Sequence, residues 1–215
     1  MKNLHLFRSI AIDALFVALF VLFTFVPYLG YYQIGPISIQ VMHVFVLIGA
    51  CLFGRKKGLL YGFIFGLTSL IKAAMYPGTF DFAFLNPFVS VLPRALFGFI
   101  AGIVFDVIKK HTTLVKFSIV TPFLCFAFTC LHTVLTMSCL YVFGVLDPFH
   151  ITEALGLSTI LTSDAFLGLI TAMSAINMVV EGAVAFVIVL PAYLAIRQIK
   201  FVKEEDDRKF KVVRA

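Results

Sequence analysis

The sequence predicts an all-α membrane protein in which six transmembrane helices form one bundle, with both termini cytoplasmic. Composition is the first observation, because 61% of the 215 residues are hydrophobic and only 13% are charged, too few to cover a soluble fold. Length is the second, because six crossings of about 20 residues nearly account for the chain. We therefore expect a transmembrane domain over residues 1–200 and a charged cytoplasmic tail over residues 201–215.

The third observation is the distribution of positive charge. All of the 17 Lys and Arg residues except Lys72 and Arg94 lie on one predicted side of the membrane, and the three opposite connections contain none. Positive charge collects in cytoplasmic loops, so this pattern places both termini inside and the protein in the cell membrane. The net charge of +6 belongs to these short flanks, which orient helices and meet anionic lipid, and it does not indicate nucleic-acid binding.

Turn residues and charges delimit the expected elements. The predicted spans are residues 9–26, 38–53, 59–75, 87–108, 114–145 and 166–196. Pro27 and Gly30 end the first span, and a tight turn over residues 54–58 separates the second from the third. The fifth is long for one crossing, so it is tilted, kinked at Pro122 or extended beyond the bilayer. The outer connections are residues 28–37, 76–86 and 146–165, and the tail is expected to be solvated and frayed.

Ionisable side chains within apolar spans are candidate ligand contacts, because such groups are costly in a bilayer. Lys72, near the outer end of the third span, either snorkels or anchors an anionic ligand. Arg94 lies about 10 Å below the outer edge of the fourth span, where its guanidinium suits the carboxylate of a ligand or of Glu181. Glu181 shares one face of the sixth span with Asn177, and both a ligand site and a buried pair with Arg94 are open.

Four uncharged polar residues extend this set. His43 and His132 each either contact a ligand or form a hydrogen bond between helices. Asn86 either caps the fourth span or closes over a ligand, and Gln40 precedes His43 on the second span. Most of these polar groups lie in the outer halves of their spans, which predicts a cavity that opens outward. A continuous polar path, which a channel or proton-coupled carrier needs, is not indicated.

No catalytic, metal or cofactor site is expected. The sequence contains no HExxH, paired aspartate or GxSxG motif, and no GxxxxGK[ST] motif for ATP. The four cysteines lie in apolar runs without CxxC spacing, which favours a packing role. We therefore predict that the chain is not an enzyme.

Small residues at four-residue spacing predict close helix contacts. Ala14 and Ala18 share one face of the first span, among bulky Leu, Phe and Val residues, and form a groove on an otherwise lipid-like helix. The glycines with this spacing on the third and fourth spans are assigned to internal packing: Gly58, Gly62, Gly66, Gly98 and Gly102.

These features occur together with a longer motif. It reads GPISIQVMH at residues 35–43, IGA at 48–50, FG at 53–54, KG at 57–58 and GFIFGLTSL at 62–70. With its six spans and Ala14-xxx-Ala18, the chain resembles the substrate-binding S components of energy-coupling factor (ECF) vitamin transporters over nearly its whole length. The motif, with Asn-Pro-Phe at residues 86–88, is most similar to the pantothenate-specific type. Arg55 and Lys56 depart from that type, in which proline is common in this turn.

The resemblance implies a mechanism. The S component captures a vitamin from outside, the outer loops 28–37 and 76–86 close over it, and the domain topples against a transmembrane T subunit. Two partner ATPase subunits drive release inside. Ala14 and Ala18 would form part of the surface that docks on the T subunit.

The resemblance also suggests roles for the candidate residues. Lys72 or Arg94 would bind the carboxylate of pantothenate, and Gln40, His43, Asn86 or Asn177 would contact its hydroxyl and amide groups, with Glu181 also in the set. The closest alternative is another vitamin on the same scaffold, such as riboflavin, folate or niacin. Alternatives of another class are an autonomous channel or carrier, and an assembly factor without a ligand.

Overall fold

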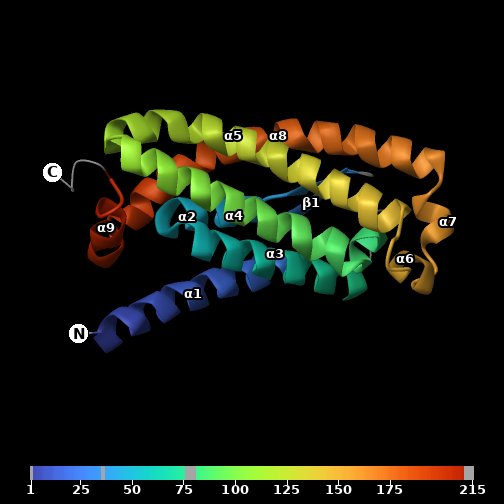
Figure 1. The fold of residues 1–215 in the computed structure, drawn as a ribbon, viewed down its shortest axis with the longest axis horizontal. Coiled ribbons are helices and arrows are strands. Elements are labelled where there is room, and N and C mark those ends of the chain that lie inside the picture. Colours follow the sequence, from blue (N-terminus) through green and yellow to red (C-terminus); the bar gives the residue numbers. More distant parts are fainter. Residues whose placement is uncertain (1, 35–36, 76–80, 211–215) are drawn as a thin grey trace.

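The computed structural model describes residues 2–34, 37–75 and 81–210, in which long helices run side by side along one axis (Figure 1). Among these residues, five helices are long and apolar enough to cross a membrane. They are α1 (Lys2–Phe25), α3 (Arg55–Met75), α4 (Pro87–His111), α5 (Leu114–Cys139) and α8 (Asp164–Arg197). The chain is therefore a largely helical, multi-pass membrane protein. The beginning of α1 and the C-terminal helix α9 (Lys200–Asp207) lie at the same end of the long axis.

The structure of residues 38–53 differs from the predicted second span. Residues 38–40 belong to a two-stranded antiparallel hairpin of β1 (Tyr31–Ile34) and β2 (Ile37–Gln40), so the fold is not purely helical. These strands are rich in Tyr and Ile, which favour extended backbone. The helix that follows, α2 (Met42–Phe53), has 12 residues and is about 18 Å long, less than the roughly 30 Å of a hydrocarbon core. A sixth crossing therefore stays a prediction.

Short helical turns connect the long elements at the end opposite α9. The 3₁₀ turn η1 (Asp81–Leu85) precedes α4, and the π-helical turn η2 (Leu140–Val145) continues α5. The predicted outer loop 146–165 contains two further turns, α6 (Ile151–Ala154) and α7 (Ser158–Leu161).

Helices α3 and α4 are in backbone contact through the predicted glycines. A Cβ atom on Gly58 would lie 2.2 Å from the carbonyl oxygen of Gly98, and one on Gly62 would lie 2.2 Å from that of Arg94. Because apolar burial does not drive association within lipid, such close packing contributes much of the stability of a membrane bundle. The prediction of internal glycine packing is confirmed, and this contact fixes the depth of Arg94 in the bundle.

We expect Gly58→Ala to destabilise the protein by about 1–3 kcal/mol or more, because the new methyl group meets backbone that cannot yield without separating the helices. Gly168→Ala on α8 is the matched control, since nothing lies within 4 Å of its Cβ position. The control should be neutral or stabilising by up to about 1 kcal/mol through helix propensity. Thermal unfolding in detergent measures both variants, and equal stability of the two would contradict the packing argument.

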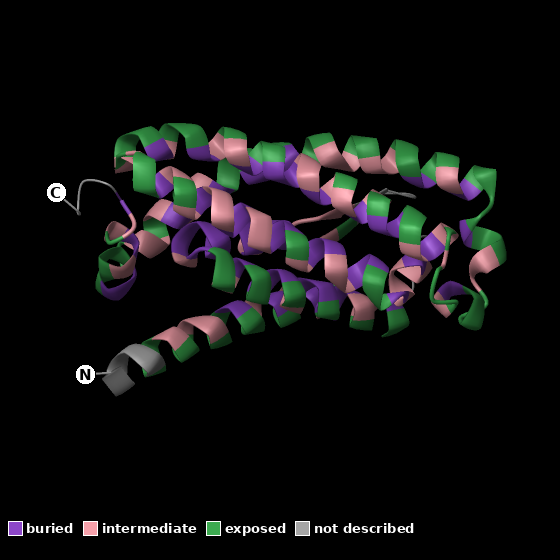
Figure 2. Ribbon diagram, in the orientation of Figure 1, coloured by how far each residue is buried: buried purple, intermediate pink, exposed green. Residues whose placement is uncertain are grey.

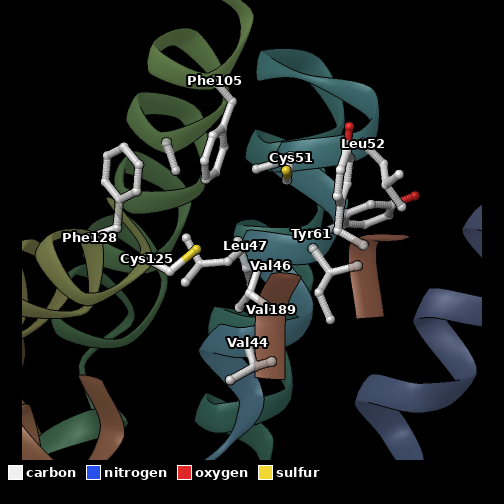
Figure 3. Packing of buried hydrophobic residues seen from close by; sticks show 14 of the residues in the cluster. Val44, Val46, Leu47, Cys51, Leu52, Tyr61, Phe105, Cys125, Phe128 and Val189 are labelled. Carbon is white, nitrogen blue, oxygen red and sulfur yellow. The ribbon is translucent and has the colours of Figure 1, made fainter. Parts of the chain in front are cut away.

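The core lies between the helix layers, and exposed side chains cover the outside (Figure 2). Helix α2 is apolar nearly all round and almost completely buried, as a central helix must be. Figure 3 shows Leu47 and Cys51 of α2 beside Phe105 of α4 and Cys125 of α5. Cys51 and Cys125 are free and buried, in agreement with a packing role.

Helix α1 packs on α3 through one face only. Asp13 accepts hydrogen bonds from Lys57 and, at 2.8 Å, from the Tyr61 hydroxyl, and Phe16 stacks on the Tyr61 ring with centroids 4.4 Å apart. Ala14 and Ala18 lie on the opposite face and are exposed. The small-residue groove of α1 therefore faces away from the bundle.

The prediction of a solvated, frayed tail is wrong for residues 201–210, which form the packed end of the chain that the structure describes. Asp206 of α9 is fully buried and forms an ion pair with Lys109 of α4, which is also fully buried. The Asp206 carboxylate also accepts hydrogen bonds from the Tyr193 hydroxyl at 2.6 Å and from Arg197 Nε at 2.8 Å. Residues 211–215 of the predicted tail lie outside the described part of the chain.

Candidate functional site

A cavity lies among the hairpin, η1 and the helices α3, α4, α5 and α8. It holds about 860 Å³ of free space including its opening. The predicted site residues that line it are Gln40, Lys72, Arg94, Asn177 and Glu181, together with His132. The structure thus gathers side chains from widely separated parts of the chain around one space.

Arg94 is the principal cation of this cavity and is almost completely buried. Its Nη1 donates a 2.6 Å hydrogen bond to the Ser90 carbonyl, and the rings of Phe65 and Phe84 each lie 4.9 Å from the guanidinium carbon. Nε has no hydrogen-bond partner among the described residues. The aromatic contacts hold the guanidinium in place and leave donors unused, which suits an anionic ligand.

Glu181 binds the hairpin and does not pair with Arg94. Its Oε1 accepts a 2.9 Å hydrogen bond from the backbone N–H of Gln40, and its Oε2 lies 4.0 Å from Nδ1 of His43. Within the described residues no carboxylate lies within 4 Å of the Arg94 guanidinium. Of the two alternatives that the sequence left open, the buried Arg94–Glu181 pair is therefore not observed.

Lys72 lies near the opening of the cavity, between η1 and the hairpin. Its Nζ donates to Asp81 Oδ2 at 2.5 Å and lies 4.4 Å from the centre of the Tyr31 ring. The Tyr31 hydroxyl is 3.0 Å from Ser69 Oγ. The ammonium of Lys72 thus already has a carboxylate partner, which makes Arg94 the stronger candidate for an anion.

The rings of two histidines stack at the cavity wall. The rings of His43 and His132 have centroids 6.2 Å apart, and only His132 lines the cavity. Nδ1 of His43 donates to the Gln40 carbonyl at 3.1 Å, which orients the ring. In the described part of the chain, His43 Nε2 and both ring nitrogens of His132 have no hydrogen-bond partner. His132 is therefore better placed for a ligand than His43, and His43 supports the site from behind.

Asn86 does not line the cavity. Its Oδ1 accepts a 3.0 Å hydrogen bond from Phe88 N at the start of α4, and its Nδ2 donates to the Phe143 carbonyl at 2.8 Å. This is the capping geometry that relieves unpaired N–H groups at a helix N-terminus. The structure therefore favours the capping role of Asn86 over contact with a ligand.

Several lining residues were not predicted from the sequence. They are Tyr31, Ser69, Asp81, Phe84, Thr133, Thr136, Met137, Met173 and Ser174, with Ala73 and Ile170. Ser174 precedes Asn177 and Glu181 at helical spacing, and Thr136 follows His132 by four residues, so a search along these helix faces would have found both. Tyr31 and Asp81 carry no such signal, because they reach the cavity from the hairpin and η1.

The lining defines the chemistry that the cavity can bind. It combines a buried guanidinium that has no carboxylate partner among the described residues, a buried carboxylate, and hydroxyl, amide and imidazole groups among Phe, Met and Ile side chains. Such a lining suits a small anion that also carries hydrogen-bond donors. Among the described residues no cluster of three or more His, Cys, Asp or Glu could hold a metal ion.

Comparison with known proteins identifies the class. A family model described as "ECF transporter, substrate-specific component" matches residues 8–193, and the chain belongs to this family. It is therefore a transporter subunit of the substrate-specific kind. A curated relative is the pantothenate transporter PanT of Leuconostoc mesenteroides subsp. mesenteroides, which is 32% identical over 104 residues. The match covers 46% of this chain and 51% of that protein, so the chain spans about half the length of this relative.

Proposed function

We propose that this chain binds pantothenate from outside the cell and is the substrate-binding subunit of an ECF importer. The observation that carries the proposal is Arg94, a buried guanidinium that faces the cavity without a carboxylate partner among the described residues. Family membership and the similarity to a pantothenate transporter support the same function.

Pantothenate carries one carboxylate, one amide and two hydroxyl groups. In the proposed complex its carboxylate accepts hydrogen bonds from Arg94, in the geometry for which a guanidinium is suited. Glu181 and Gln40 Oε1 can accept from the hydroxyl groups, and Asn177 and His132 can contact the amide. Lys72 remains paired with Asp81, and because this ion pair is neutral overall, Arg94 supplies the positive charge for the ligand.

We place both termini in the cytoplasm and count six crossings. The basic flanks support this orientation. Helix α2 covers the inner part of its crossing, and the hairpin of β1 and β2 fills the outer part. The two strands pair with each other, and the Gln40 N–H donates to Glu181, so part of the hairpin backbone is satisfied within the protein, as a lipid environment requires.

Transport requires partners in this proposal. Ala14 and Ala18 dock on the T subunit, and two ATPase subunits supply the energy. The exposed position of both alanines, opposite the face of α1 that packs on α3, supports the docking role.

We expect Ala14→Trp to abolish uptake by the assembled transporter while pantothenate binding to the isolated subunit is unchanged. The indole would fill the groove that lets a second helix approach closely. Leu15→Trp is the matched control, because Leu15 is also exposed on α1 and its side chain is already bulky, so the change fills no gap left by a small residue. Uptake of radiolabelled pantothenate in proteoliposomes measures both variants, and normal uptake by Ala14→Trp would refute the docking face.

Titration calorimetry of the detergent-purified protein with pantothenate tests the substrate. We expect tight one-to-one binding, with riboflavin, folate, niacin and thiamine as comparisons. Tight binding of another vitamin would replace pantothenate and keep the class of transporter. A protein that binds none of the five would contradict the proposed capture function.

A further inference from the structure

A second cavity lies where α3 begins and α4 ends, far from the proposed vitamin site. It holds about 670 Å³ of free space including its opening, and Arg55, Ile103, Asp106, Val107, Lys110 and Lys209 line it. Both helices are long enough to cross the membrane, so their ends, and this cavity, lie close to a membrane surface. This placement does not depend on the proposed function.

The cavity carries an excess of positive charge. Its single carboxylate, Asp106, already accepts hydrogen bonds from the backbone N–H of Arg55 at 3.2 Å and from Lys209 Nζ at 3.1 Å. The guanidinium of Arg55 and the ammonium of Lys110 are exposed and have no hydrogen bond or ion pair among the described residues. Three cations and one carboxylate give a formal charge of +2, which favours an anionic ligand.

The Asp106 carboxylate is held in one position, beside Gly54 at the start of α3. Gly54 adopts φ +81°, and a Cβ atom there would lie 2.3 Å from Asp106 Oδ2. The absence of a side chain at Gly54 therefore lets the carboxylate reach the first N–H of α3. In this position Asp106 binds Lys209 and leaves Arg55 and Lys110 available for a ligand.

One wall of the cavity is apolar. Ile103, Val107 and Lys110 follow one another at helical spacing on α4, so the two apolar side chains lie deeper along the helix than the lysine. Val107 is 47% exposed. A cationic end at the membrane surface followed by the exposed Val107 and the half-buried Ile103 matches the order of phosphate and acyl chain in a phospholipid. Basic pockets between transmembrane helices are known to hold anionic headgroups.

We propose that Arg55 and Lys110 bind the phosphate of an anionic phospholipid, whose acyl chain lies along Val107 and Ile103. The excess charge distinguishes this ligand from a zwitterionic lipid, and the apolar wall distinguishes it from free phosphate. Because α3 and α4 are joined by their glycine contact, a lipid bound here holds the inner end of that pair at the level of the headgroups.

Native mass spectrometry of the detergent-purified full chain tests this site with dioleoyl-phosphatidylglycerol and dioleoyl-phosphatidylcholine. We expect one phosphatidylglycerol to bind at least 10-fold more tightly than phosphatidylcholine. Arg55→Gln combined with Lys110→Gln should remove most of this preference. Lys56→Gln combined with Lys116→Gln is the matched control, because it removes the same charge from exposed residues that do not line the cavity.

Three results would overturn the proposal. One is that the unmodified protein binds the two lipids with equal affinity. Another is equal loss of phosphatidylglycerol in both double variants, which would indicate a diffuse surface attraction. The third is displacement of the lipid by millimolar inorganic phosphate, which would assign the site to phosphate without acyl chains. All four substituted side chains are exposed, and thermal unfolding of each variant verifies that the fold is retained.

Discussion

Replacing Asp206 by alanine should lower the free energy of unfolding by about 3–5 kcal/mol, the range found when one partner of a buried ion pair is removed. The variant leaves the fully buried Lys109 without its carboxylate. It also removes the hydrogen-bond acceptor of Tyr193 and one acceptor of Arg197. Among the described residues, only the Cys51 carbonyl, 2.5 Å from Lys109 Nζ, would remain as an acceptor for the ammonium, alongside the rings that surround it.

Asp207→Ala is the matched control for this prediction. Asp207 also pairs with Arg197, but its side chain is 33% exposed, so its loss should cost about 1 kcal/mol or less. Thermal unfolding in detergent compares the two variants. A double variant, Lys109→Met with Asp206→Leu, removes both charges and should regain much of the lost stability. Equal unfolding temperatures for Asp206→Ala and Asp207→Ala would show that burial does not determine how much the ion pair of Lys109 and Asp206 contributes to stability.

Replacing Arg94 by alanine should weaken pantothenate binding by about 10- to 150-fold, which corresponds to one hydrogen bond to a charged group of about 1.5–3 kcal/mol. The reason is that the ligand carboxylate would then lie in a buried cavity without its guanidinium partner. The fold should persist, because among the described residues no carboxylate within 4 Å loses a partner when Arg94 is removed. Titration calorimetry measures the affinity, and thermal unfolding without ligand verifies the fold.

Two further variants separate the contributions to this effect. Arg94→Lys keeps the charge but loses the planar arrangement of donors, so its affinity should lie between those of Arg94→Ala and the unmodified protein. Lys72→Ala should have a smaller effect than Arg94→Ala, because Lys72 already pairs with Asp81. Unchanged affinity in Arg94→Ala would return Arg94 to a structural role and leave Lys72 as the candidate for the carboxylate.

The sequence predicted the features that depend on the properties of each residue and its near neighbours in the chain. Helix α3 covers Arg55–Met75 against the predicted span 59–75, and α4 covers Pro87–His111 against 87–108. The part of a helix that crosses lipid is predominantly apolar, so composition locates it. Arg94 and Glu181 could be selected for the same reason, because an ionisable group in an apolar span requires a partner or a cavity.

The pattern of neighbouring residues did not predict the features that depend on contacts between segments far apart in the chain. The hairpin depends on pairing between two strands, and the apolar run of residues 38–53 does not distinguish this pairing from a longer helix. Asp81 and Tyr31 lie in connections, where polar and aromatic residues are common, and only packing brings them to Lys72. The roles of His43 and Asn86 were likewise open, since the same residue types serve in ligand contacts and in structural hydrogen bonds.

By itself the sequence determined that this is a membrane protein with polar groups buried toward one side, because the cost of polar and charged atoms in lipid acts on each residue separately. Only the tertiary structure decided which of those groups share the cavity, that Arg94 lacks a carboxylate partner among the described residues, and that the C-terminal segment is packed. The ion pair of Lys109 and Asp206 joins residues 97 positions apart. Such contacts depend on the folded arrangement of the helices, which no local pattern of residues encodes.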